Sequence, residues 1–180
     1  MIETPKVVVV PYDRAWKSAF DAIRAEIEAA LGDRILSVEH VGSTSVEGMS
    51  AKPIIDIDVV IPDEAVLDEI VRSLAEIGYR HEGDLGIRGR EAFKYTDKPH
   101  LMKHHLYVCP QNSEELHRHI TFRDYLRQHP EAVRTYSRVK EEGAALFPDD
   151  MERYIAHKSP CIEELYRMCG LQQNILPMNH

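Results

Sequence analysis

Long hydrophobic runs are missing from this chain. The apolar stretch Val7 to Val10 has only four residues, whereas a membrane-spanning helix needs roughly 18 or more. The N-terminal residues MIETPK also lack the charged and then apolar pattern of a secretory signal peptide. We therefore expect a cytoplasmic protein without a membrane partner.

The chain also has few cysteines and no excess of positive charge. The three cysteines, Cys109, Cys161 and Cys169, are too widely spaced for a CxxC metal knuckle, which argues against a disulfide framework and a zinc finger. The chain has 22 basic and 30 acidic side chains and a net charge of −8. Because an acidic surface repels polyanions, nucleic acid is a disfavoured partner. A small anionic ligand stays compatible with this charge if a metal ion or a local basic patch holds it.

What remains is the composition of an ordinary folded domain. The chain has 180 residues, of which 43% are hydrophobic and 29% charged, and this length and mixture predict one domain over residues 1–180. Strand and helix patterns alternate over about residues 1–110, and residues 111–180 are mostly helical in pattern. We predict an α/β (α+β) fold, a mixed β-sheet with flanking helices and a helical C-terminal extension.

Hydrophobic periodicity locates the elements. Asp13 is placed to cap a helix whose apolar side chains recur every three or four residues: Trp16, Phe20, Ile23, Ile27 and Leu31. Strands are expected at Val7–Val10, Ile35–Val41, Pro53–Pro62, Ala92–Tyr95 and His105–Val108. Further helices are expected after Asp63 and from Ser113 to about Gly170, with breaks near Pro130 and Pro148.

Two carboxylates, Asp56 and Asp58, lie one residue apart on the strand expected at 53–62. Residues i and i+2 of a strand share a face, so both carboxylates project together while Ile55 and Ile57 enter the core. Neighbouring carboxylates raise each other's proton affinity unless a cation lies between them. Mg²⁺ (or Mn²⁺) suits such a pair, because a hard ion takes carboxylate oxygens and keeps substrate phosphates as further ligands.

A small, polar loop from Gly42 to Lys52 precedes this strand. Glycine lets the backbone approach a ligand closely, and the hydroxyls of Ser43, Thr44 and Ser45 suit phosphate oxygens. Lys52 could add a point charge. Together, the loop and the aspartate pair predict a site for a nucleoside triphosphate, in which the loop holds the outer phosphates and the aspartates hold metal at the α-phosphate.

The stretch EHVGSTSVEGMSAKPIIDIDVV, residues 39–60, closely resembles the signature of the GrpB family, which belongs to the nucleotidyltransferase superfamily. The similarity continues through PYDRAW, HHLYVCPQNSEELHRH and FRDYLRQHPEAVRTYSRVK. This resemblance implies a nucleotidyltransferase-like mixed sheet. The superfamily pattern transfers to four positions here: Gly42, Ser43, Asp56 and Asp58.

The resemblance also implies a third carboxylate on a later strand, commonly the base that activates the acceptor hydroxyl. The equivalent segment, residues 105–109, has no Asp or Glu. His105 could bind metal or act as the base in its place. Alternatively, Glu82, Asp84 or Glu91 could supply a carboxylate from elsewhere.

The leading hypothesis is metal-dependent transfer of a nucleoside monophosphate from a nucleoside triphosphate to an unidentified hydroxyl acceptor. Two divalent ions would bridge Asp56, Asp58 and the triphosphate while pyrophosphate leaves. The alternative is a non-catalytic module that binds a nucleotide or a phosphometabolite and keeps the fold without a complete carboxylate set. A third option is an interaction domain that uses its helical face.

Charged residues elsewhere leave choices open. Between Arg80 and His105 there are six basic and four acidic side chains, so this segment could form one wall of an anion-binding cleft. Arg123 and Arg127 either belong to a charged solvent face or reach a phosphate. Lys158 could point to the cleft or to water.

Two histidines of the C-terminal half complete the inventory. His117 and His119 are two residues apart in a helical pattern, so they do not face each other. We expect both at the surface.

Overall fold

A computed structural model describes residues 5–171 of the chain. In this part of the chain, a five-stranded sheet has the order β1-β2-β5-β4-β3. Its strands are β1 (Ser37–Val41), β2 (Ile55–Ile61), β3 (Arg80–Gly83), β4 (Glu91–Lys94) and β5 (His104–Pro110). β2 and β5 run parallel and the other neighbouring pairs are antiparallel, which confirms the predicted mixed sheet.

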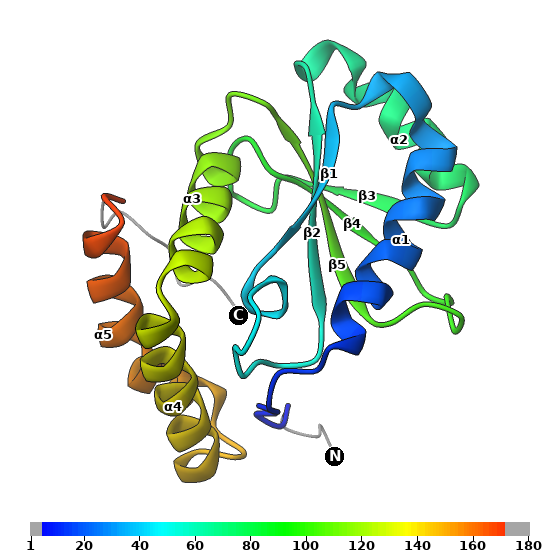
Figure 1. Ribbon diagram of the computed structural model, residues 1–180. Helices are drawn as coiled ribbons and strands as arrows, with labels where there is room; N and C mark the ends of the chain where they lie inside the picture. The colour runs from blue at the N-terminus through cyan, green and yellow to red at the C-terminus, as the bar shows by residue number, and fades with distance from the viewer. Residues whose placement is uncertain (1–4, 172–180) are drawn as a thin grey trace.

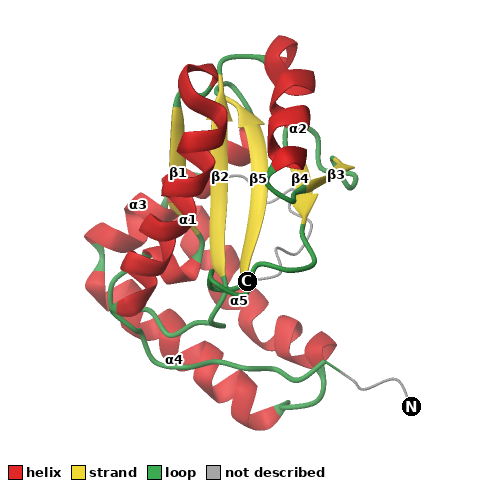
Figure 2. Ribbon diagram, turned by 90° about the vertical axis from the view of Figure 1, so that its right-hand side faces the viewer, coloured by secondary structure: helices red, strands yellow, loops and turns green. Residues whose placement is uncertain are grey.

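Helices lie on both sides of the sheet. They are α1 (Ala15–Leu31), α2 (Leu67–Glu76), α3 (Glu114–Gln128), α4 (Pro130–Leu146) and α5 (Met151–Met168), with short 3₁₀ helices η1 (Gly32–Arg34), η2 (Ser43–Ser45) and η3 (Glu64–Val66). α1 and α2 cover one face and α3 lies on the other side (Figure 1). α4 and α5 lie beyond one end of the strands (Figure 2). None of the helices in residues 5–171 has the length and apolar character that crossing a bilayer requires.

The main hydrophobic core lies between the sheet and the pair α1–α2. Alternate residues of β2, Ile55, Ile57 and Val59, enter it together with the apolar stripe of α1. Each fully buried aliphatic side chain stabilises the fold by about 1.5–3 kcal/mol, and a slip of one residue would expose all of them. The core therefore fixes the direction of the residues in between, which include both aspartates.

The element boundaries agree with the sequence except at two places. Asp13 and Ser113 accept hydrogen bonds from the first turns of α1 and α3, as expected of caps. Val7–Val10 forms no named strand, and only Val10 pairs, as an isolated bridge to Ala51. β3 was not predicted because its sequence, RHEG, is short and polar. Pro130 begins α4, where its missing N–H costs no helical hydrogen bond.

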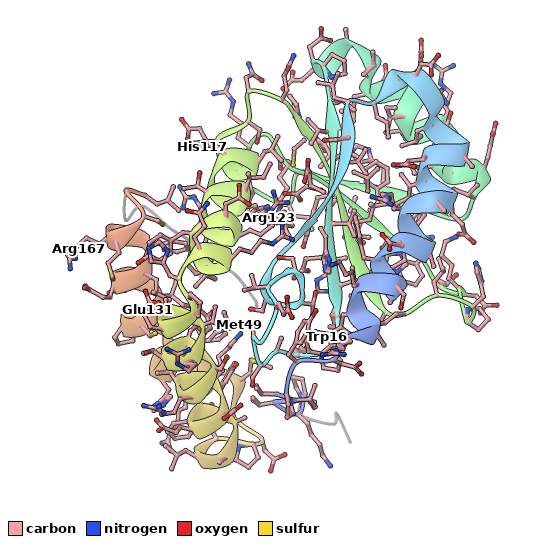
Figure 3. All side chains as sticks on the ribbon, in the orientation of Figure 1. Trp16, Met49, His117, Arg123, Glu131 and Arg167 are labelled. Atoms are coloured by element: carbon pink, nitrogen blue, oxygen red, sulfur yellow. The ribbon has the colours of Figure 1, made fainter. Side chains whose placement is uncertain are left out.

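A second core joins the loop before β2 to the C-terminal helices. Val46 and Met49 of this loop pack against residues of α3, α4 and α5, among them Phe122, Tyr136 and Tyr166. Met49 extends from the loop to α4 (Figure 3), where its sulfur accepts a hydrogen bond from Ser137. The loop is thus held between the sheet and the helices, and a ligand at this loop would contact both.

Candidate functional site

The two aspartates of β2 share one face of the sheet with two residues of β5. Asp56 lies opposite His105 and Asp58 opposite Tyr107 in the parallel register. These four positions alternate with residues of the main core. The face they occupy is the one opposite α1 and α2, as the Asp-x-Asp spacing predicts.

Asp56 and His105 form a hydrogen-bonded pair. The distance from His105 Nδ1 to Asp56 Oδ1 is 3.0 Å. An ionised carboxylate can only accept, so Nδ1 donates, and Nε2 carries the lone pair when the ring is neutral. The Asp56 side chain is 14% exposed and that of His105 is 42% exposed, so the histidine forms the accessible side of the pair.

Gly42 makes room for Asp56. It has φ +72°, and a Cβ added there would overlap the carboxylate of Asp56. Only glycine combines this left-handed backbone with such a close approach. The glycine that begins the predicted phosphate loop therefore also positions the acidic side chain.

We expect Gly42→Ala to destabilise the protein much more than Gly86→Ala. Gly86 has φ +83° but open space around the Cβ position, so its substitution should cost only the backbone strain, about 1 kcal/mol. At Gly42, overlap with Asp56 should add about 2 kcal/mol or more. Urea unfolding of both variants measures the difference, and equal losses would contradict the role assigned to Gly42.

Asp58 is the inner member of the pair. It is fully buried, and its Oδ2 accepts a hydrogen bond from Nδ1 of His119 at 2.6 Å. His119 belongs to α3 and is buried too, so the prediction that it lies at the surface is wrong; His117 is exposed (Figure 3). Burial alone would lower the pKa of His119, but the charge and hydrogen bond of Asp58, with Glu115 nearby, outweigh burial and raise it.

The donor atoms fit a divalent ion that also needs ligands from a substrate. Asp58 Oδ1 is buried and has no hydrogen-bond partner in the described part of the chain, and such an orphaned oxygen is one that a cation or water would satisfy. Asp56 adds a second hard carboxylate two residues away. Among residues 5–171, no group of three or more His, Cys, Asp and Glu side chains is arranged to hold an ion. These residues therefore fit Mg²⁺ completed by phosphates and water, rather than an all-protein cage.

A cavity of about 290 Å³ opens beside Asp56. Its walls come from the Gly42–Lys52 loop, the start of β2, α5 and residues 7–8. The predicted site residues that line it are Ser43, Thr44, Lys52, Asp56 and His105. Side chains distributed along the sequence thus meet around one space, and Lys158 of α5 joins them.

Two buried lysines lie at this cavity: Lys158 lines it, and Lys140 contacts Ser43, which lines it. Lys140 of α4 donates from Nζ to Ser43 Oγ at 2.8 Å. Lys140 and Lys158 are each only 1% exposed. Burial lowers the pKa of Lys140 well below its usual value, and the charge of Lys158 lowers it further. Burial, with the charge of Lys52, lowers the pKa of Lys158 to about 8. An anion in the cavity would stabilise the protonated form of both lysines.

We expect the free energy of unfolding to rise with pH between about 8 and 10. Lys158 has a pKa of about 8 in the folded protein and 10.5 as its ordinary value, so the unfolded chain binds more protons in this range and stability rises. Between pH 7.5 and 9.5 the gain from this residue should be about 2 kcal/mol. Urea unfolding at both pH values tests it. Lys158→Met should remove the share of the rise that comes from Lys158, while Lys140, whose pKa is also lowered, keeps its own share. An undiminished rise in this variant would contradict the assignment.

The other hydroxyls and arginines brace the loop. Thr44 Oγ1 donates to the carbonyl of Ile54 and lies 2.9 Å from Nε2 of His40, whose pKa burial lowers to about 4. Ser45 Oγ donates to the carbonyl of Gly42.

Two arginines of α3 reach the same region. Arg127 donates twice to the carbonyl of Ser45, and Arg123 donates to Glu39 and to the carbonyl of His40. Arg123 points from α3 toward the sheet (Figure 3). Both arginines therefore hold the beginning of the loop in place, which neither a solvent face nor a direct phosphate contact describes.

The alternative carboxylates lie away from Asp56. Glu91 pairs with His81 at 2.7 Å, Glu82 lies 3.8 Å from Lys94, and Asp84 caps the turn at Gly86. The family resemblance implies a third carboxylate on the strand that is β5 here. At that place, the β2–β5 register puts His105 opposite Asp56.

Sequence reasoning missed Lys140 and misjudged His119, and it left Lys158 open. All three share a signal, because each charged or titratable side chain stands on the buried stripe of its helix. Lys140 follows Val133 and Tyr136 at helical spacing, and Lys158 follows Tyr154. A polar residue on an apolar stripe indicates a buried contact.

Comparisons with known proteins agree with this architecture. The model of the GrpB protein family matches residues 6–168. Protein YqkA of Bacillus subtilis is 32% identical over 88% of this chain, which spans only 46% of YqkA's length. The crystal structure of the conserved protein GrpB from Enterococcus faecalis is similar with a TM-score of 0.78, at 32% identity, covering 90% of this chain and 96% of that one.

A more distant likeness shows the fold class. The structure of the Cid1 poly(U) polymerase with bound MgGTP has a TM-score of 0.54 to this chain at 11% identity, covering 76% of this chain and 44% of that one. At this identity the likeness shows the fold alone, a nucleotidyltransferase-like arrangement of sheet and helices. Because the family model matches nearly the whole described region, the chain belongs to the GrpB family.

Proposed function

We propose that this protein binds a nucleoside triphosphate in the cavity beside Asp56 and transfers a nucleoside monophosphate to a hydroxyl acceptor. The observation that carries the proposal is the contact between Lys140 and Ser43 at the wall of this cavity. A lysine amine held there against a neutral hydroxyl favours an anion next to it. Asp56 lines the same cavity, and carboxylates beside bound phosphates require a cation between them.

A phosphate in the cavity would stabilise the charged form of the buried lysines. Burial of Lys140 costs free energy that its contacts with Ser43 Oγ and the ring of Tyr136 offset in part, and an opposite charge nearby would offset more of it. A triphosphate supplies that charge. We assign the outer phosphates to Ser43, Lys140 and Lys158, with Lys52 at the exposed rim. The hydroxyls of Thr44 and Ser45 keep the loop in shape, and its backbone contributes N–H groups.

Asp56 and Asp58 would hold a divalent ion, Mg²⁺ or Mn²⁺, whose chemistry is to neutralise charge on the phosphates. His119 fixes the orientation of Asp58 through its hydrogen bond. The close contact with Gly42 fixes the position of the Asp56 carboxylate. The acidic side of the cavity is therefore oriented before a ligand arrives, which lowers the entropy cost of binding.

We assign to His105 the role of accepting the proton of the acceptor hydroxyl. In the reaction, a bond forms between the acceptor oxygen and the α-phosphorus, and the bond from that phosphorus to the pyrophosphate oxygen breaks. The pyrophosphate takes the electron pair, and Nε2 of His105 takes the hydroxyl proton. Its Nδ1 donates to Asp56, which orients the ring and leaves Nε2 as the acceptor.

A second candidate is a module that binds a nucleotide or a phosphometabolite without turning it over. It is favoured by the histidine and tyrosine that β5 offers opposite Asp56 and Asp58, where superfamily enzymes usually have a carboxylate. Both candidates require the cavity to bind phosphates. They differ in whether pyrophosphate is released.

The test has two arms. Calorimetric titration with ATP and GTP, with and without Mg²⁺ or Mn²⁺, measures binding, and an enzymatic pyrophosphate assay with a panel of alcohols measures turnover. Metal-dependent binding with pyrophosphate release supports the transferase, and binding without release supports the module. Absence of heat at ligand concentrations of about 1 mM, where even a weak interaction of roughly 4 kcal/mol would half-saturate the site, would overturn the transferase and a module specific for these nucleotides.

A further inference from the structure

A second, more open cleft of about 620 Å³ lies on the same face of the sheet as the aspartates. It is lined by side chains from β3, β4, β5 and the segment before β5. His105 and Tyr107 alternate along β5, and Lys103 directly precedes this strand. Lys94 of β4 and Glu82 of β3 lie beside them. The helix α3 contacts β1 and β5. The cleft lies at β3, β4 and β5, and thus at the side of the sheet away from β1.

The cleft and the cavity meet at one residue. His105 lines both of them, because β5 lies between β2, which carries Asp56, and β4. A molecule in the cleft would therefore present a group at His105, on the opposite side of this ring from the phosphates proposed for the cavity. Two ligands bound in this way would approach each other at the Asp56–His105 pair.

Three lysines and two carboxylates line the cleft: Lys94, Lys98, Lys103, Glu82 and Asp97. Lys94 and Lys103 are exposed side chains on its wall. Lys94 lies 3.8 Å from Glu82, but its side chain is 52% exposed, and such exposed pairs contribute little. Arg90 lies over the ring of Tyr107 at 4.3 Å, and its buried Nε has no hydrogen-bond partner within residues 5–171. The segment therefore favours an anion, although the whole chain has a net charge of −8.

The rim of the cleft adds an apolar contact. Leu85 is 60% exposed and has φ 52°, a left-handed conformation that is unfavourable for a leucine. The turn is held by the hydrogen bond from the N–H of Gly86 to Asp84. Strained residues cluster at ligand sites, and this one places an apolar side chain at the edge of a polar cleft.

We propose that this cleft binds the acceptor, and that the acceptor is a small alcohol carrying an anionic group. The inference rests on the proposed function. Lys94, Lys103 and Arg90 attract the anionic group, and the hydroxyl reaches His105. A small molecule suits the volume, since small-ligand sites measure about 300–1,000 Å³. The acidic chain disfavours a polynucleotide, whose many phosphates would extend beyond this local patch.

The first experiment measures binding in the cleft without any nucleotide. Two-dimensional NMR follows the ring signals of His105 and Tyr107 while glycerol 3-phosphate, ribose 5-phosphate, glycerate, glycerol or inorganic phosphate is added. We expect the phosphorylated alcohols to shift both rings and glycerol to shift neither. Glycerate tells whether a carboxylate suffices. No shift with any anionic alcohol would overturn the inference, and so would binding of inorganic phosphate as tight as that of the alcohols.

Matched variants locate the effect. The double variant Lys94→Glu/Lys103→Glu should raise the Kd of the phosphorylated alcohol at least tenfold and leave the Kd of MgATP unchanged. The charge-matched control Lys17→Glu/Arg72→Glu, on α1 and α2, should change neither. Unaltered alcohol binding in the cleft variant would overturn the inference, as would tighter binding of a short RNA than of the alcohols. If the wild type bound no ATP while the ring signals of His105 and Tyr107 still shifted with the alcohols, the proposed function would be overturned instead.

Discussion

Asp56→Asn is expected to abolish metal-dependent binding of ATP. The substitution keeps the shape of the side chain but removes its negative charge, so the carboxylate proposed to hold the ion at the cavity is lost, and the charge that faces His105 is lost with it. We expect the Kd of MgATP to rise at least about 100-fold, equivalent to roughly 3 kcal/mol. Pyrophosphate release should fall by about 1,000-fold or more, because charge neutralisation by the ion contributes several kcal/mol.

Two controls make this result interpretable. Asp33→Asn changes an exposed aspartate of η1 and should leave binding unchanged. Asp58→Asn breaks a buried pair with His119, and such a loss typically costs about 3–5 kcal/mol of stability, so its effect on binding would be mixed with unfolding. Asp56→Asn should retain the wild-type unfolding curve. A variant that still binds ATP with the same metal dependence would exclude Asp56 as a ligand.

Lys140→Met is expected to change stability and binding in opposite directions. Methionine has nearly the same length as lysine and no charge, so it should relieve the desolvation that lowers the pKa of Lys140. Replacing a buried charge by an apolar side chain of similar volume is often neutral or stabilising by about 1–4 kcal/mol. The same substitution removes the cation next to Ser43, and we expect the affinity for ATP to fall about 10- to 100-fold, or roughly 1.4–2.8 kcal/mol.

Urea unfolding and calorimetry on the same sample measure the two effects. Lys17→Met, at an exposed position of α1, serves as the control and should alter neither. A less stable Lys140→Met protein that binds ATP as well as the wild type would show that the lysine supports the fold and not a ligand. Opposite signs would show that stability is sacrificed at this position for function.

The sequence predicted that Asp56 and Asp58 share one face of the sheet, since this arrangement depends on local spacing. Asp56 and Asp58 alternate with Ile55 and Ile57, and the burial of the isoleucines forces both carboxylates onto the other face. The loop from Gly42 was recognised for the same reason, because its small residues lie directly between two strands. The three-dimensional structure adds that Gly42 makes room for Asp56 itself.

The contacts of Lys140 and His119 could not be predicted from local spacing. Lys140 and Ser43 are 97 residues apart, and only the packing of α4 against the loop brings them together. His119 reaches Asp58 across 61 residues, from α3 to β2. The apolar stripe of a single helix indicates that such a lysine or histidine is buried, but the residue that it contacts depends on which element covers that side.

By itself, the sequence determined the alternation of strands and helices, the face of the paired carboxylates, and the family, because periodicity and short motifs are local properties of the chain. The tertiary structure decided that His105 lies beside Asp56, that Lys158 lines the cavity while Lys140 reaches Ser43 at its wall, and that a second cleft begins at the same histidine. The physical reason is that a buried charge or a cavity is created by the packing of elements against each other, and strand order and helix placement are set by the whole core.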